Sequence, residues 1–162
     1  MKLQTMGWLV LLCSALPGVA AAQESTAFNL TGRILPGVCR IAASDVDLGT
    51  FYATDFTGVG TTKPWITTSI QVSNCDPLIT RVALSFSGTA DTANANYFRG
   101  VAGIGIEMER ESPSTPVRPA GTTLQYATAN GLYMVRARFR QTAATVAAGS
   151  VSSAVTVSMS YN

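Results

Sequence analysis

The sequence is poor in the residues that catalysis and metal binding use. None of its 162 residues is histidine, and only 12% are charged. The absence of histidine excludes Ser-His-Asp and Cys-His catalysis and a histidine-based metal site. The basic residues form no stripe with interleaved aromatic side chains, so nucleic-acid binding is not favoured. Beyond the N-terminus there is no apolar run long enough to span a bilayer.

The charged residues that remain follow the alternation of strands. Glu107 and Glu109 alternate with apolar residues, as do Arg136, Arg138 and Arg140. Both sets are expected to form solvated strand faces. The glycines near residues 58–60 precede no helical pattern, which argues against a phosphate site. We therefore expect no enzyme activity, no catalytic, cofactor or metal site, and no small-molecule substrate.

The first 22 residues have the pattern of a secretory signal peptide. Lys2 is followed by a short apolar run over residues 7–16, a Pro-Gly break, and three alanines that offer a cleavage site after Ala22. The run of about ten residues is too short to span a membrane. Cys13 lies within it, without the small preceding residue that a lipoprotein site requires.

Two cysteines, Cys39 and Cys75, follow the predicted cleavage site. In an exported protein an isolated pair predicts one disulfide, and the alternative is two free thiols. The disulfide would close a loop of about 36 residues, for which chain entropy gives about 3–4 kcal/mol.

The sequence after Cys39 favours an all-β domain. Short alternating runs, separated by Gly, Pro, Asn and Asp, indicate an antiparallel sandwich of immunoglobulin-like size. Six main strands are expected, with a short strand at residues 123–126 and an edge segment at residues 46–51. The main strands are expected over residues 38–42, 65–75, 81–87, 104–109, 132–140 and 151–161.

The last predicted strand has no expected partner along one edge, because the chain ends at Asn162. A separate alternating stretch precedes Cys39, with Thr26, Phe28, Leu30, Gly32 and Ile34 on one face. It is either the first strand of the domain or a strand that completes a sheet in another molecule.

Five segments together resemble fimbrial (pilus) subunits of the chaperone–usher type. They are F-N-L-T-G-R-I before Cys39, V-D-L-G at residues 46–49, N-C at residues 74–75, F-S-G-T-A-D at residues 86–91, and the closing run with penultimate Tyr161. The resemblance spans the whole chain after the signal peptide. The second and fourth segments are most similar to minor adaptor subunits of type 1-like fimbriae.

The resemblance implies an incomplete immunoglobulin-like sandwich of six main strands, with its seventh strand supplied in trans by a neighbour. Residues 1–22 are then the signal peptide, residues 23–37 the donor-strand extension, and residues 38–162 the pilin domain. The donor residues are Thr26, Phe28, Leu30, Gly32 and Ile34. The strand that borders the acceptor groove and pairs with a chaperone contains Val151, Val155, Val157, Met159 and Tyr161.

The implied function is that of a structural subunit of an adhesive pilus, polymerising by donor-strand exchange as a minor or adaptor subunit. The implied partners are a periplasmic chaperone, an outer-membrane usher and neighbouring subunits, and the protein passes through the periplasm to a surface fimbrium. The alternatives are the major rod pilin of the same kind of fimbria and a secreted lectin-like adhesin. Tip adhesins of this family resemble a receptor domain joined to a pilin domain, for which the chain is too short.

Overall fold

The structure, a computed structural model, describes residues 27–33 and 38–161. The chain divides into two units, Met1–Arg33 and Ile34–Asn162, and each is described by itself. In the first unit, residues 27–33 are exposed and belong to no helix or strand. The predicted signal peptide, Thr26 and Ile34 lie outside the described residues, so the predicted domain boundaries stay predictions.

The described part of the second unit contains nine strands and one short 3-10 helix, η1 (Ala53–Asp55). No helix in the described residues has the length and apolarity that a membrane crossing requires. The strands are β1 (Arg40–Ala43), β2 (Ile66–Ser73), β3 (Val82–Gly88), β4 (Phe98–Arg99), β5 (Ile104–Arg110), β6 (Thr115–Val117), β7 (Thr122–Tyr126), β8 (Gly131–Gln141) and β9 (Val155–Tyr161).

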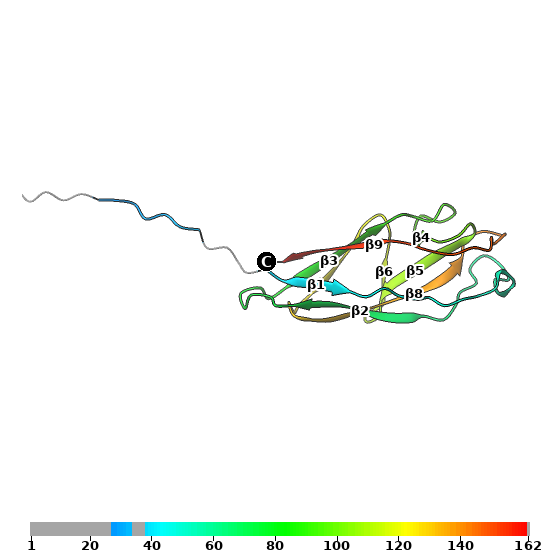
Figure 1. Ribbon diagram of the computed structural model, residues 1–162, viewed down its shortest axis with the longest axis horizontal. Helices are drawn as coiled ribbons and strands as arrows, with labels where there is room; N and C mark the ends of the chain where they lie inside the picture. Colours follow the sequence, from blue (N-terminus) through cyan, green and yellow to red (C-terminus); the bar gives the residue numbers. More distant parts are fainter. Residues whose placement is uncertain (1–26, 34–37, 162) are drawn as a thin grey trace, which may run out of the picture. The chain divides into compact units, whose positions relative to one another are not determined.

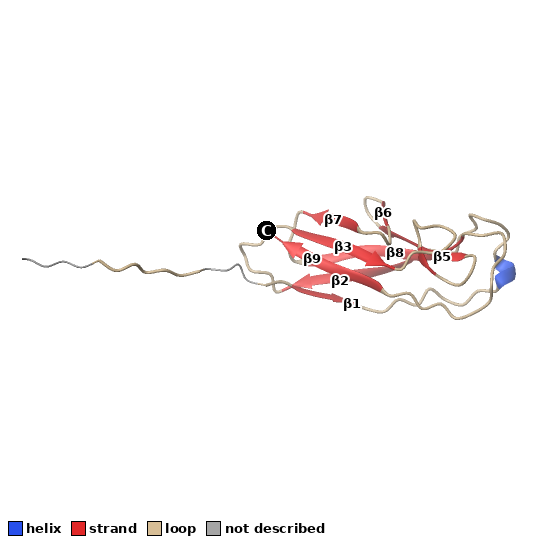
Figure 2. Ribbon diagram, turned by 90° about the horizontal axis from the view of Figure 1, so that it is seen from above, coloured by secondary structure: helices blue, strands red, loops and turns tan. Residues whose placement is uncertain are grey.

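The strands form two antiparallel sheets that face each other (Figure 1 and Figure 2). The larger sheet has the order β1-β2-β8-β5-β4, with β6 paired to β5. The smaller sheet has the order β7-β3-β9. The strands β1 and β9 are therefore edge strands of different sheets, and both views place them on the same side of the molecule. The predicted all-β architecture of two sheets is confirmed.

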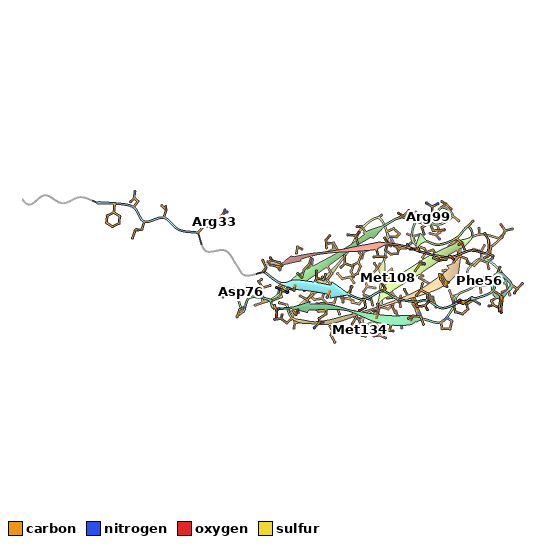
Figure 3. All side chains as sticks on the ribbon, viewed as in Figure 1. Arg33, Phe56, Asp76, Arg99, Met108 and Met134 are labelled. Carbon is orange, nitrogen blue, oxygen red and sulfur yellow. A yellow bond between two sulfur atoms is a disulfide. The ribbon has the colours of Figure 1, made fainter. Side chains whose placement is uncertain are left out.

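The core follows from the alternation of apolar residues along the strands. In β3, Val82, Leu84 and Phe86 are at most 1% exposed, while Ser85 between them remains accessible and bonds Thr123 of β7. Side chains of this kind from both sheets fill the space between them, and Met108 of β5 packs against the buried cluster from its margin (Figure 3).

The six longer predicted strands correspond to β1, β2, β3, β5, β8 and β9, and the short one at residues 123–126 to β7. Two further strands, β4 and β6, lie in segments for which no strand was expected. Residues 46–51 form no strand. The last strand begins at Val155 rather than Val151, which corrects the expected range. Residues 151–154 have no strand partner in the described chain, so no ladder extends through them.

The predicted disulfide between Cys39 and Cys75 is present in the structure. It joins the residue before β1 to the chain just after β2, with 4.1 Å between the two Cα atoms. The backbone N–H of Cys75 also donates to the side-chain oxygen of Asn130, at 3.1 Å. The covalent bond and the hydrogen bond fix three chain segments at one end of the larger sheet.

Candidate strand-binding groove

A groove of about 1050 Å³ lies between the two sheets on the side where β1 and β9 are edges. We call residues 43–51, which run on from the last residue of β1, the β1 wall. We call residues 146–157, which lead into β9 and include its first three residues, the β9 wall. Both walls line the groove. Residues 44–51 and 148–154 belong to no strand. The walls therefore offer backbone groups that a further strand is able to pair with.

The floor of the groove is the inner face of the larger sheet. It is formed by apolar side chains of β2, β5 and β8 that point between the sheets. The floor residues are Ile70, Ile104, Ile106, Met108, Val135, Ala137 and Phe139. An apolar floor of this kind favours an occupant that presents apolar side chains on one face.

The strand β9 carries a half-buried apolar stripe. Its residues alternate between partly buried and exposed along the whole strand. Val155, Val157, Met159 and Tyr161 pack against the core, and Thr156, Ser158 and Ser160 are exposed. One edge of β9 pairs with β3, and no described strand pairs with the other edge. Val151, predicted as part of this strand, lies in the β9 wall and lines the groove.

A cluster around Lys63 holds the far end of the β1 wall. The Lys63 ammonium donates to the backbone oxygen of Asp55 at 2.8 Å. It also lies 5.2 Å from the centre of the Phe51 ring and 4.5 Å from that of Phe56. The Phe51 ring packs edge-on against Phe139 of the floor. These contacts seat the wall on the sheet without closing the groove.

Gln141, at the end of β8, connects the chain segments at Gly58 and Ala143. It is only 2% exposed. Its side-chain oxygen accepts from the N–H of Gly58, and its side-chain amide donates to the oxygen of Ala143, each at 2.9 Å. Sequence reasoning missed this residue. Its position could have identified it, because Gln141 continues the series of inward-facing residues of β8. A buried polar side chain at such a position needs hydrogen-bond partners.

Of the predicted donor residues, Phe28, Leu30 and Gly32 are described, and these three lie in the first unit. Phe28 and Leu30 are 79% and 88% exposed. At Gly32 no atom lies within 4 Å of the position that a Cβ would occupy. Both side chains are therefore accessible to another molecule.

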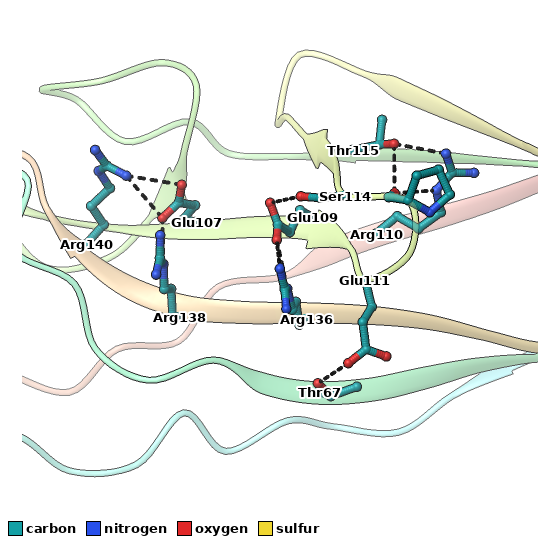
Figure 4. A network of polar contacts seen from close by, with 11 residues as sticks. Thr67, Glu107, Glu109, Arg110, Glu111, Ser114, Thr115, Arg136, Arg138 and Arg140 are labelled. Atoms are coloured by element: carbon teal, nitrogen blue, oxygen red, sulfur yellow. Dashed lines mark hydrogen bonds and ion pairs between the residues drawn. The ribbon is translucent and has the colours of Figure 1, made fainter.

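The outer face of the larger sheet contrasts with the groove. Here the predicted solvated arginines and glutamates pair across β5 and β8 (Figure 4). Arg136 pairs with Glu109, whereas Arg138 and Arg140 both pair with Glu107, at 2.8 and 3.2 Å. The Trp65 ring covers two of the guanidiniums, 4.8 Å from that of Arg136 and 4.0 Å from that of Arg138.

These contacts set the charge state of Glu109. Burial raises the pKa of its carboxyl, but hydrogen bonds from Ser114 and Arg136 and the charges of Arg136 and Arg138 outweigh burial, so the pKa lies below its ordinary value. The charges on this face are therefore satisfied within the chain. In the described residues no group of three or more His, Cys, Asp or Glu side chains is placed to hold a metal ion.

Comparison with known proteins gives one consistent family. The family model described as Fimbrial protein matches residues 28–162. The S-fimbrial adhesin protein SfaS of Escherichia coli O6:K15:H31 (strain 536 / UPEC) is 31% identical over 146 residues, which cover 88% of each chain. The type-1 fimbrial protein, A chain, of Salmonella typhi is 28% identical over 151 residues, covering 78% of this chain and 82% of that protein.

Two solved structures of pilus proteins share this fold. The P pilus rod subunit PapA superposes with a TM-score of 0.64 at 17% identity, covering 86% of this chain and all of that one. A chain of a chaperone-usher pilus superposes with a TM-score of 0.60 at 16% identity, covering 91% of this chain and all of that one. These likenesses confirm the predicted sandwich fold.

Proposed function

The chain belongs to the fimbrial protein family, and from this premise we propose that it joins its neighbours by donor-strand exchange. It is a structural subunit of a chaperone–usher fimbrium and not an enzyme, and it associates with other pilus subunits in a surface fimbrium. In the proposed reaction, residues 26–34 of one subunit enter the groove of the next as an added strand.

One observation carries this proposal: the apolar groove runs beside an edge of β9 that no described strand pairs with. A long apolar edge is a template for strand addition, and proteins that do not use such an edge cover or charge it. The exposed side of β9 carries only Ser and Thr. The edge is thus left open and uncharged, as an acceptor edge requires.

The extension has the complementary pattern. Alternation places Phe28, Leu30 and Ile34 on one face with Thr26 and Gly32. In a strand laid on β9, this face would meet the floor of the groove. Gly32 would meet the part where the floor comes closest, because glycine is unfavourable in a strand unless another surface approaches closely.

Strand exchange with synthetic extensions tests the proposal. Mature subunit, purified from the periplasm with its chaperone, is mixed with peptides of residues 23–35, and complexes are resolved by native electrophoresis. The unmodified peptide should displace the chaperone, and the Gly32→Leu peptide should not, because overpacking a fitted groove is destabilising. The Thr31→Leu peptide is the matched control, since it adds the same side chain on the outward face. Equal exchange by all three peptides would contradict the assigned face.

We propose the same groove as the chaperone site before assembly. The supporting feature is again the open edge of β9, which a chaperone strand would cover while the subunit crosses the periplasm to an outer-membrane usher. The signal-peptide pattern of residues 1–22 supports this route.

Within the fibre, we propose the place of a minor or adaptor subunit, on the likeness of residues 46–49 and 86–91 to such subunits. The alternative, the major rod pilin, is supported by the similarity to the type-1 fimbrial A chain. A lectin-like adhesin is favoured only by the name of the SfaS relative. Abundance decides among them: an adaptor is scarce in sheared fimbriae, a rod pilin predominates, and an adhesin alone binds a glycan array.

A further inference from the structure

Within the alternating stretch of the extension, residues 26–34, Arg33 is the only charged residue, and it lies near the C-terminal end. The other charged residue of the extension, Glu24, precedes this stretch. The side chain of Arg33 is exposed (Figure 3). Arg33 has the opposite parity to Gly32 and Ile34, so in an inserted strand it would project away from the groove floor. A charge at this position distinguishes the C-terminal end of an inserted extension from its N-terminal end.

The rim of the groove carries the opposite charge on one side only. In the β1 wall, Asp45 and Asp47 are exposed and alternate with Val46 and with Leu48, which packs against the core. Neither aspartate forms an ion pair within the described residues. One oxygen of Asp47 accepts from the N–H of Gly49, at 2.8 Å, so its carboxylate is partly oriented.

The acidic rim lies opposite one particular end of β9. The groove is lined by Asp45 and Asp47 and, across from them, by residues 146–155 and Val157, but not by Met159 or Tyr161. An extension that runs antiparallel to β9 would bring Arg33 beside the start of β9 and hence beside the acidic rim. An extension that runs parallel to β9 would place Arg33 at the Tyr161 end, away from both aspartates.

We propose that Arg33 of one copy, in an extension that runs antiparallel to β9, pairs with Asp45 and Asp47 on the groove rim of a second copy. This inference rests on the proposed donor-strand exchange and names the partner of the groove. The occupant is the extension of this same chain, because the charge match is between its own extension and its own rim. Arginine is suited to this contact because its planar guanidinium engages carboxylates with two hydrogen bonds.

Charge reversal tests the pairing. The chaperone-bound mature subunit is mixed with peptides of residues 23–35, either unmodified or Arg33→Glu, at low and at high salt. Exposed ion pairs are weak and steer association, so Arg33→Glu should slow exchange roughly two- to five-fold at low salt and less at high salt. A subunit with Asp45→Lys and Asp47→Lys should reverse the preference. Equal rates for the two peptides on the unmodified subunit would overturn the pairing.

Cross-linking tests the direction. A peptide with Arg33→Cys should form a disulfide with a subunit carrying Asp45→Cys, and not with one carrying Ser160→Cys near the other end of β9. The reverse result would overturn the antiparallel direction. If the unmodified peptide never displaces the chaperone, the proposed exchange itself fails. If that peptide exchanges but the charge and cross-linking tests fail, only the Arg33 pairing is wrong.

Discussion

Two strands of the smaller sheet, β3 and β9, have the same alternation, but their inward side chains are buried to different extents. Leu84 and Phe86 of β3 are 0% and 1% exposed, because β3 has a partner on each side. Val157 and Met159 of β9 are only partly buried, because β9 has a partner on one side only. The difference shows that the pattern of a strand sets which side chains turn inward, and that the neighbouring strands set how far they are buried.

A similar contrast separates the two faces of the larger sheet. On the outer face, the charges of β5 and β8 are paired and covered by Trp65 within the chain. On the inner face, the floor beside the β9 wall is apolar and open to an occupant. The predictions below test whether the open side is completed by another molecule, from the largest expected effect to the smallest.

The first prediction is that binding of a donor peptide removes the difference in burial between β3 and β9. Burial of Phe28, Leu30 and Ile34 contributes roughly 5–9 kcal/mol gross, at about 1.5–3 kcal/mol for each side chain. Saturating peptide of residues 23–35 should therefore raise the urea midpoint of the oxidised mature chain substantially. The chain used in this experiment carries Gly32→Leu, so that its own extension does not compete with the peptide for the groove. A high midpoint without peptide, unchanged by its addition, would contradict an incomplete fold.

The second prediction compares the same kind of truncation on the two strands. Leu84→Ala should lower the free energy of unfolding by about 2–5 kcal/mol, because it opens a cavity in a closed core. Val157→Ala should cost about 1 kcal/mol or less without donor peptide, since its side chain is only partly buried. With peptide bound, the cost at Val157 should rise while that at Leu84 stays the same. Urea unfolding with and without peptide measures both.

The third prediction concerns the chain segments that Gln141 connects. Gln141→Leu leaves the N–H of Gly58 and the oxygen of Ala143 without their side-chain partner, at a cost of about 1–3 kcal/mol. Amide hydrogen exchange should quicken in residues 57–62 and 143–148 but not in β3. Gln125→Leu, on the exposed side of β7, is the control and should change neither. Uniform exchange across the chain would show that Gln141 does not act locally.

The smallest effect is expected on the paired outer face. Because the folded pKa of Glu109 lies below its ordinary value near 4.5, its contribution to stability is complete above that value and is lost as pH falls through the folded pKa. The contribution is under about 1 kcal/mol for a partly exposed pair. Unfolding from pH 7 to pH 3 should show a smaller acid loss for Glu109→Gln than for the unmodified chain. Identical profiles would exclude this role.

Much of the fold could be predicted because the longer strands alternate cleanly. The inward positions of β3 follow directly from this pattern, and the turn residues give its ends. The strands β4 and β6 were missed because two or three residues are too few to show an alternating pattern, and β6 also contains Pro116. Ile66 has the same place in the alternation as Ile70, yet it is 37% exposed, because it lies at the end of β2.

The groove could be predicted only in part. The sequence indicates the apolar stripe of β9 and the extension that matches it. It does not show that residues 46–51 and 151–154 stay out of strands, because that depends on whether a partner strand is present. The pairing of Arg138 with Glu107 also needs the register of β5 against β8, which is set by contacts across some thirty positions of the chain.

The disulfide determines how force would pass through the protein. A pull on the extension reaches the domain at Cys39, directly before β1. With only four residues, β1 alone would be peeled away from β2 one hydrogen bond at a time. The bond to Cys75 instead carries the load to the end of β2, which pairs with β8 along seven residues in the centre of the larger sheet. The short edge strand β1 is thereby removed from the path of tension.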